Sequence, residues 1–151
     1  MQPAEITAAL YRASSSPNGL QAVRHFIVKI RDLDKDSILE GLLATFEHRS
    51  CTAHEIACAV LWCLEVPFTR NLVVTLKQLL PNWDLSVEEL PFYLAAACGK
   101  ENLEEALDQI RETVEDCSPV AEKLDTFHWW LSADARSIEE IRETWNCKLI
   151  C

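Results

Sequence analysis

At 151 residues the chain fits one domain, residues 1–151, because a chain of this size buries about 68–70% of the surface that its unfolded form exposes. Apolar residues make up 49% of the sequence and there are only three glycines, which excludes disorder and disfavours a turn-rich β-sandwich. The formal net charge of −10 disfavours partners such as nucleic acid and anionic membranes.

The first half of the chain carries signals for two pairs of helices. Pro3 suits a first helical position, and Ile6 and Leu10 follow it at helical spacing. Asn18 and Thr52 each stand three residues before Gln or Glu, which is the capping-box spacing that marks a helix start. These signals predict helices over 3–14, 19–31, 36–48 and 52–65.

The second half repeats the same signals. Apolar residues at helical spacing follow Thr69, Ser86 opens another capping box, and Ser118 precedes a proline that suits the first helical position. A final box begins at Ser137. We therefore expect further helices over 69–80, 86–98, 102–115 and 118–132, and a last one from Ser137 to about Cys147.

Pro91 disagrees with this scheme, because it falls five residues after the predicted cap at Ser86. A proline in a helix interior removes one backbone hydrogen bond and clashes with the preceding turn. Either the helix is kinked at Pro91, or it starts later and residues 86–90 form a separate turn.

The helix starts recur with a fixed period. Asn18, Thr52 and Ser86 are 34 residues apart, and a second series runs through Pro3, Asp36, Thr69 and Asn102 at intervals of 33. Two starts in each period indicate two helices per repeat. The predicted fold is all-α, a right-handed solenoid-like stack of about four helical hairpins. The last helix, from Ser137, is expected to cap the end of the stack.

The period and the segment Glu89-Leu90-Pro91-Phe92-Tyr93-Leu94-Ala95 resemble the α-solenoid proteins, most nearly HEAT-like helical repeats. Tetratricopeptide and ankyrin repeats have a similar period, but their sequence signatures are missing here. The resemblance implies a binding scaffold with a concave helical surface.

The chain is expected to be cytoplasmic. Its first residues lack the basic and apolar pattern of a signal peptide, and no stretch reaches the roughly 18–20 uncharged apolar residues that span a bilayer. The cysteines number seven, which is odd, and most fall at apolar positions of the predicted helices. Such cysteines are typical of small hydrophobic side chains in a reducing compartment.

One cluster has the residue types of a metal site. His48, Cys51, His54 and Cys58 span a predicted turn and the helix after it, and nitrogen and sulfur ligands are those that structural zinc prefers. The alternative is structural, because a capping box from Thr52 explains the turn and Cys58 falls near the core positions. We favour the structural alternative and predict no metal and no cofactor.

Signals for catalysis are missing from the sequence. No family signature surrounds a cysteine or a serine, and there is neither a glycine-rich phosphate loop nor a nucleotide fingerprint. We therefore predict a protein that is not an enzyme and has no catalytic residues.

The charge lies almost entirely in the second half, which carries −9 over residues 76–151 against −1 over residues 1–75. On the helix predicted for 102–115, acidic side chains fall opposite the apolar stripe. Adjacent Trp129 and Trp130 cannot both face one core, and helical spacing turns Trp129 away from it, beside His128. Two alternatives stay open: Trp129 packs under the last helix, and the acidic face serves solubility alone. The predicted partner-binding residues are Glu101, Glu104, Glu105, Asp108, Glu112, Glu115, His128 and Trp129.

These features predict a non-enzymatic protein-binding module that holds a basic protein. A small acidic cytosolic protein of this kind resembles an immunity protein, an inhibitor of a bacterial toxin or nuclease. A secretion or assembly chaperone and a structural dimerisation domain remain alternatives, and a zinc- or thiol-dependent enzyme is the alternative from another class. The sequence leaves the oligomeric state open.

Overall fold

The computed structural model describes residues 1–150, and within that range every regular element is helical. The all-α prediction is confirmed. The α-helices are α1 (Pro3–Ser14), α2 (Leu20–Ile30), α3 (Lys35–Leu43), α4 (Cys51–Cys63), α5 (Leu72–Leu79), α6 (Glu89–Cys98), α7 (Lys100–Arg111), α8 (Pro119–Leu131) and α9 (Ala135–Leu149), with short 3₁₀ helices η1 (Ala44–Glu47) and η2 (Leu80–Asn82).

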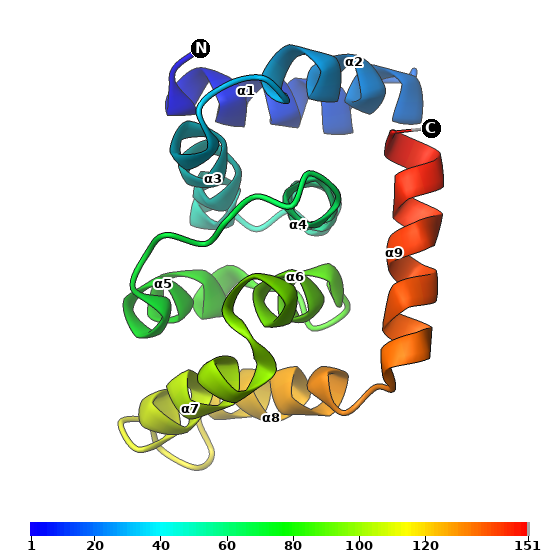
Figure 1. Cartoon of the computed structure of the whole chain (residues 1–151). Helices are drawn as coiled ribbons and strands as arrows, with labels where there is room; N and C mark the ends of the chain where they lie inside the picture. The colour runs from blue at the N-terminus through cyan, green and yellow to red at the C-terminus, as the bar shows by residue number, and fades with distance from the viewer. Residues whose placement is uncertain (151) are drawn as a thin grey trace.

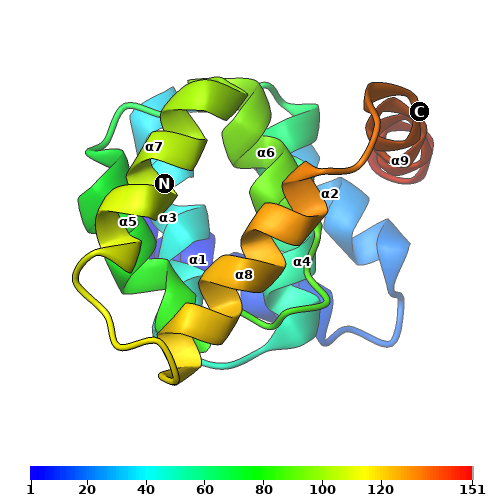
Figure 2. The same ribbon diagram turned by 90° about the horizontal axis from the view of Figure 1, so that it is seen from below.

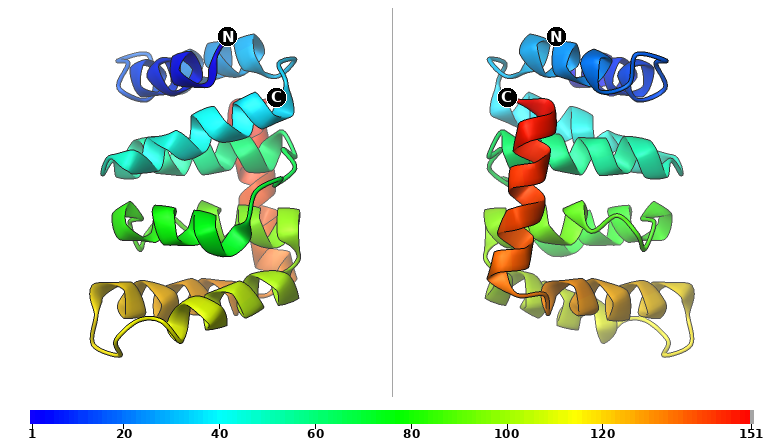
Figure 3. Two further views of the ribbon diagram at one scale, coloured as in Figure 1. Left: turned by 90° about the vertical axis from the view of Figure 1, so that its left-hand side faces the viewer. Right: turned by 90° about the vertical axis from the view of Figure 1, so that its right-hand side faces the viewer.

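The first eight α-helices form four layers of two helices each, stacked in chain order (Figure 1). The layers are α1 with α2, α3 with α4, α5 with α6, and α7 with α8, as the side views also show (Figure 3). α1 packs on α3, and α4 packs on α6, which packs on α8. The predicted pairing of helices is therefore present, one pair to a layer.

The sequence period corresponds to the step from one layer to the next. The Thr7 hydroxyl donates to the carbonyl of Gly41 at 2.6 Å, and the Tyr11 hydroxyl donates to the carbonyl of Thr45 at 2.8 Å. Each pair is 34 residues apart. A side chain on one layer thus meets the residue one period later on the next layer.

The core follows the same period. Leu10, Leu43 and Leu76 are all buried, as their recurrence in phase predicts. Gly41 lets the first two layers approach closely, since a Cβ atom there would lie 2.8 Å from the carbonyl oxygen of Pro3. One continuous apolar core therefore runs through the layers.

The predicted helix caps are mostly displaced. Ser118 accepts the amide of Ala121 as predicted, but α3, α4, α5 and α9 are capped by Asp34, Ser50, Asn71 and Asp134. The predicted starts at Asp36, Thr52, Thr69 and Ser137 are wrong by two or three residues, while α2 and α7 begin after Gly19 and Gly99 instead of at Asn18 and Asn102. Several cap-forming residues stand close together, and box spacing alone does not choose among them.

The helix around Pro91 starts late and is not kinked there. α6 begins at Glu89, which places Pro91 in the first turn, where the missing amide costs no intrahelical hydrogen bond. The predicted start at Ser86 is wrong, because the Ser86 amide donates to the side chain of Asp84 at 2.9 Å in a separate turn.

α9 does not cap the end of the stack. It leaves the end of α8 and runs back along one side of the layers to α2 (Figures 1 and 3). α9 packs against α4 and α2. The side of the stack offers packing partners for the apolar stripe of α9. Trp145 is buried there, and the Trp145 indole N–H donates to Glu89 at 3.2 Å. The prediction of a capping position is therefore wrong.

Two more polar contacts fix α9 along this side. The Arg142 guanidinium lies 2.7 Å from a carboxylate oxygen of Glu65, and the Arg24 Nε donates to the carbonyl of Lys148 at 2.5 Å.

The described helices include none that is long and apolar enough to cross a membrane.

Candidate protein-binding face

The outer side of the last layer is left uncovered by α9 (Figures 1 and 2). We call this surface the acidic end face and define it by exposed side chains of α7 and α8 and the residue that ends α7. They are Glu101, Glu105, Asp108, Glu112, Glu122, Asp125 and Trp129.

The α7 part of this face follows from helical periodicity. Leu103, Leu107 and Ile110 are buried at spacings of four and three, which turns the acidic residues of the helix outward. Glu104 is the exception, because it is half-buried and its carboxylate lies 4.0 Å from the Lys100 ammonium on the same helix. Glu115 is exposed, but it lies beyond α7 in the connection to α8.

The two tryptophans of α8 separate as predicted. The Trp130 ring is half-buried and its N–H donates to the carbonyl of Leu85 at 2.9 Å. The Trp129 side chain is 64% exposed, and its ring meets Trp130 edge-on at 4.6 Å between centroids. The prediction that Trp129 points away from the core is confirmed.

Polar contacts hold the two helices of this layer together. Asp108 lies 3.6 Å from the His128 ring nitrogen, and Asp125 lies 3.0 Å from the Arg111 guanidinium, which also donates to the carbonyl of Ala121 at 2.9 Å. The structure thus brings His128 and Trp129 to the same layer as the acidic helix. His128 itself is half-buried between the helices.

Sequence reasoning missed Glu122 and Asp125 because it followed the acidic ridge of one helix only. A usable signal was present, since residues 122, 125 and 129 are spaced by three and four and therefore share one face of α8. Residues 100–131 carry nine acidic and three basic side chains, a net charge of −6. Within this acidic segment, residues 100–131, Trp129 is the exposed large apolar side chain.

The candidate zinc cluster does not assemble. His54 is buried against Phe46, with the ring centroids 4.0 Å apart, and its Nε2 faces the carbonyls of Thr45 and His48 at 3.0 and 2.7 Å. Burial lowers the pKa of His54. Across residues 1–150 there is no group of three or more His, Cys, Asp or Glu side chains that could hold a metal ion.

The two cysteines of that cluster lie in different surroundings. Cys58 is fully buried, and burial raises the pKa of its thiol well above the usual value. Cys51 is exposed, with its sulfur 3.6 Å from the Ser86 hydroxyl. The structural alternative is correct for Cys58, which lies in the core, whereas the turn is capped by Ser50 and not by a capping box from Thr52.

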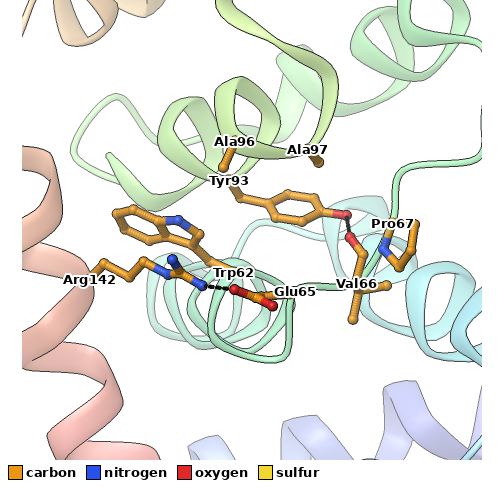
Figure 4. Close-up of a pocket in the computed structure, with 8 residues that line it drawn as sticks. All are labelled: Trp62, Glu65, Val66, Pro67, Tyr93, Ala96, Ala97 and Arg142. Carbon is orange, nitrogen blue, oxygen red and sulfur yellow. Dashed lines mark hydrogen bonds and ion pairs between the residues drawn. The ribbon is translucent and has the colours of Figure 1, made fainter. Parts of the chain in front are cut away.

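A cavity of about 340 Å³ lies between α4 and α6 beside α9 (Figure 4). Its aromatic walls are Trp62 and Tyr93, and the Tyr93 hydroxyl donates to the carbonyl of Val66 at 2.8 Å. The Glu65–Arg142 ion pair closes one end. No Cys, Ser or His is among the residues that line this cavity. Glu65, the carboxylate that lines it, is paired with Arg142, and the Tyr93 hydroxyl is held by the Val66 carbonyl.

Glu89 is the one buried acidic residue in the described part of the chain. Burial, together with the nearby charges of Glu55 and Glu88, raises its pKa to about 7. One carboxylate oxygen accepts from Trp145, and the other has no hydrogen-bond partner within residues 1–150. This group lies under α9 and takes no part in the acidic end face.

Comparison of the chain with protein-family models, curated proteins and solved structures finds no match.

Proposed function

We propose that this chain is a non-enzymatic protein-binding module whose acidic end face holds a basic protein. The observation that carries the proposal is Trp129, an indole that is 64% exposed in the same layer as the exposed acidic side chains of α7 and α8. α9 leaves the outer side of that layer uncovered (Figure 2). A charged outer face alone is explained by solubility, since the last layer of a helical stack needs a polar outer side. A largely exposed tryptophan is not explained in that way.

The energetics of protein interfaces fit this arrangement. Tryptophan is enriched among the few residues that supply most of the binding energy, and surrounding charges steer a partner of opposite sign. Acidic residues on α7 and α8 would attract the basic partner, and Trp129 would supply the apolar anchor. As a finer proposal, the module is an immunity-like inhibitor that occludes the basic active site of a toxin or nuclease in the cytoplasm.

Affinity capture with matched variants tests this function. Four proteins are each immobilised and exposed to a lysate of the source cells. They are the wild-type chain, Trp129→Ala, Glu105→Lys/Glu112→Lys and the control Glu139→Lys/Glu143→Lys. The control makes the same charge change at exposed positions of α9. We expect basic proteins that the wild type and the control retain and that both end-face variants lose.

The purified partner then gives the affinity and the kinetics. Trp129→Ala should cost about 2 kcal/mol of binding free energy while changing the free energy of unfolding by less than about 0.5 kcal/mol. Glu105→Lys/Glu112→Lys should slow association and reduce its salt dependence. A partner that binds both end-face variants as tightly as the wild type would refute this face as the binding site. Inhibition of the partner's activity tests the finer proposal separately.

A further inference from the structure

The first layer of the stack has the opposite charge to the last. Residues 1–31 carry four basic side chains and one acidic, a net charge of +3, against −6 for residues 100–131. These two layers form the two ends of the stack, and α9 covers neither outer side (Figures 1 and 3). The chain is therefore polarised along the direction in which its layers stack.

The exposed side of α2 carries an apolar residue among cations. Val23, Phe26 and Ile27 are buried, so the opposite side of the helix faces outward, and Val28 on that side is 59% exposed. Arg12 of α1 and Lys29 of α2 are exposed in the same layer.

A shallow hollow lies at this exposed side. We call it the α2 hollow; it is open, and Gln21, Arg24, His25 and Val28 of this one helix line it. Arg24 is fixed there, because its Nε donates to the carbonyl of Lys148 at the end of α9. An indole ring can lie on Val28 beside the Arg24 guanidinium, an arrangement that cation–π attraction favours.

We propose that copies of this chain associate head to tail, with Trp129 and the acidic end face of one copy seated on the α2 hollow of the next. Charge complementarity selects a second copy as the occupant, because the two surfaces have opposite signs and belong to the same chain. Contact between two acidic end faces would bring like charges together. The joined surfaces differ, so the contact is heterologous and leaves a free face at each end for further copies.

This inference rests on the proposed function in one respect, since stacking and capture of a basic protein use the same acidic end face. The two events therefore compete. A basic partner should dissociate the stacks, and stacking should lower the apparent affinity for the partner.

Analytical ultracentrifugation of the full-length chain tests the inference. Reductant is needed, because Cys51, Cys117 and Cys147 are exposed free cysteines. In low salt we expect the average mass to rise with protein concentration, and in high salt to return to the monomer mass as the charges are screened. Trp129→Ala should weaken association about 30-fold, the ratio that corresponds to a hot-spot residue.

Charge-reversed variants establish which faces meet. Each of two variants should remain monomeric alone: Arg12→Glu/Lys29→Glu and Glu105→Lys/Glu112→Lys. An equal mixture of the two should associate again, because the first keeps the acidic end face and the second keeps the basic first layer. Glu139→Lys/Glu143→Lys, on α9, should associate as the wild type does. Only a heterologous contact predicts recovery on mixing.

Two results would overturn the inference. One is a wild-type chain that stays monomeric at every concentration in low salt, and the other is self-association that survives in both charge-reversed variants. A monomeric wild type that still captures a basic protein through Trp129 would remove the stacking and leave the proposed function. Stacking without any captured basic protein would remove the proposed function and leave the stacking.

Discussion

Glu89 shows how burial sets the behaviour of a single side chain. It is 5% exposed, the Trp145 indole is the one side chain within residues 1–150 that donates to it, and its pKa is raised to about 7. A carboxyl group whose pKa is higher in the folded chain stabilises the fold at low pH. That contribution is complete below the unfolded pKa of about 4.3 and is lost as the pH rises through the folded pKa near 7.

Glu89→Gln should remove this pH dependence. The amide oxygen can still accept from Trp145, so we expect the variant to unfold like the wild type near pH 4 and to be more stable at pH 8, by up to roughly 3 kcal/mol. Chemical unfolding at both pH values measures the difference. Glu139→Gln, at an exposed position of α9, is the control and should follow the wild type at both. Parallel curves for wild type and Glu89→Gln would show that Glu89 is not a buried ionisable group.

At the scale of elements, the contact between the first two layers depends on a glycine. A Cβ atom at Gly41 would lie 2.7 Å from the Cβ of Ile6 and 2.8 Å from the carbonyl oxygen of Pro3. The Thr7 hydroxyl spans the same contact by donating to the Gly41 carbonyl. Close approach of α1 and α3 therefore requires the missing side chain.

Gly41→Ala should force α1 away from α3 and cost about 1–3 kcal/mol of the free energy of unfolding, the usual range for an overpacked core. Thr7→Val separates the two effects, because it removes the hydrogen bond without adding bulk at residue 41. Denaturant unfolding measures both variants. An unchanged midpoint for Gly41→Ala would contradict the close packing of these helices.

α9 is held along the stack by few buried residues, of which Trp145 is the largest. Trp145→Ala should cost about 3–5 kcal/mol and release α9, because it removes both the packing and the hydrogen bond to Glu89. Hydrogen exchange should then show fast exchange of the α9 amides while α1, α4 and α6 stay protected. Trp145→Phe, which keeps the packing, should retain α9. Equal loss of protection in all layers would show that α9 does not detach by itself.

The whole molecule concentrates its charge at one end, and this has a cost for stability. Acidic side chains on α7 and α8 repel one another, and salt screens them over a Debye length of about 10 Å at 0.1 M. We expect the midpoint of thermal unfolding to rise as salt increases from about 0.01 to 0.15 M. Glu105→Lys/Glu112→Lys should flatten this response, and Glu139→Lys/Glu143→Lys, on α9, should change it less. A wild-type midpoint that falls with salt would contradict repulsion as the dominant effect.

Local signals in the sequence are sufficient for the class of fold and the pairing of helices. The apolar residues Leu10, Leu43 and Leu76 recur in phase, and all three are buried. The position of Trp129 was predictable for the same reason, because a helix cannot turn two adjacent residues toward one core. Periodicity determines which side of each helix is buried, and it does so without knowledge of the neighbours.

The tertiary structure decided what depends on neighbours distant in the sequence. Thr69 donates to the Asp36 side chain at 2.7 Å in the layer before it, and the cap of α5 falls to Asn71. Helical spacing places Asp125 on one face of α8 with Trp129, but only the packing of α8 beside α7 brings it within 3.0 Å of the Arg111 guanidinium.

The position of α9 also depends on neighbours that are distant in the sequence. Its apolar stripe indicates that it packs, but the choice of the side of the stack over its end depends on distant partners: Glu65 pairs with Arg142, and Glu89 accepts from Trp145. By itself the sequence determined the periodic stack and the side of each helix that is buried. Only packing between distant segments placed α9 along the side, which left the acidic end face open.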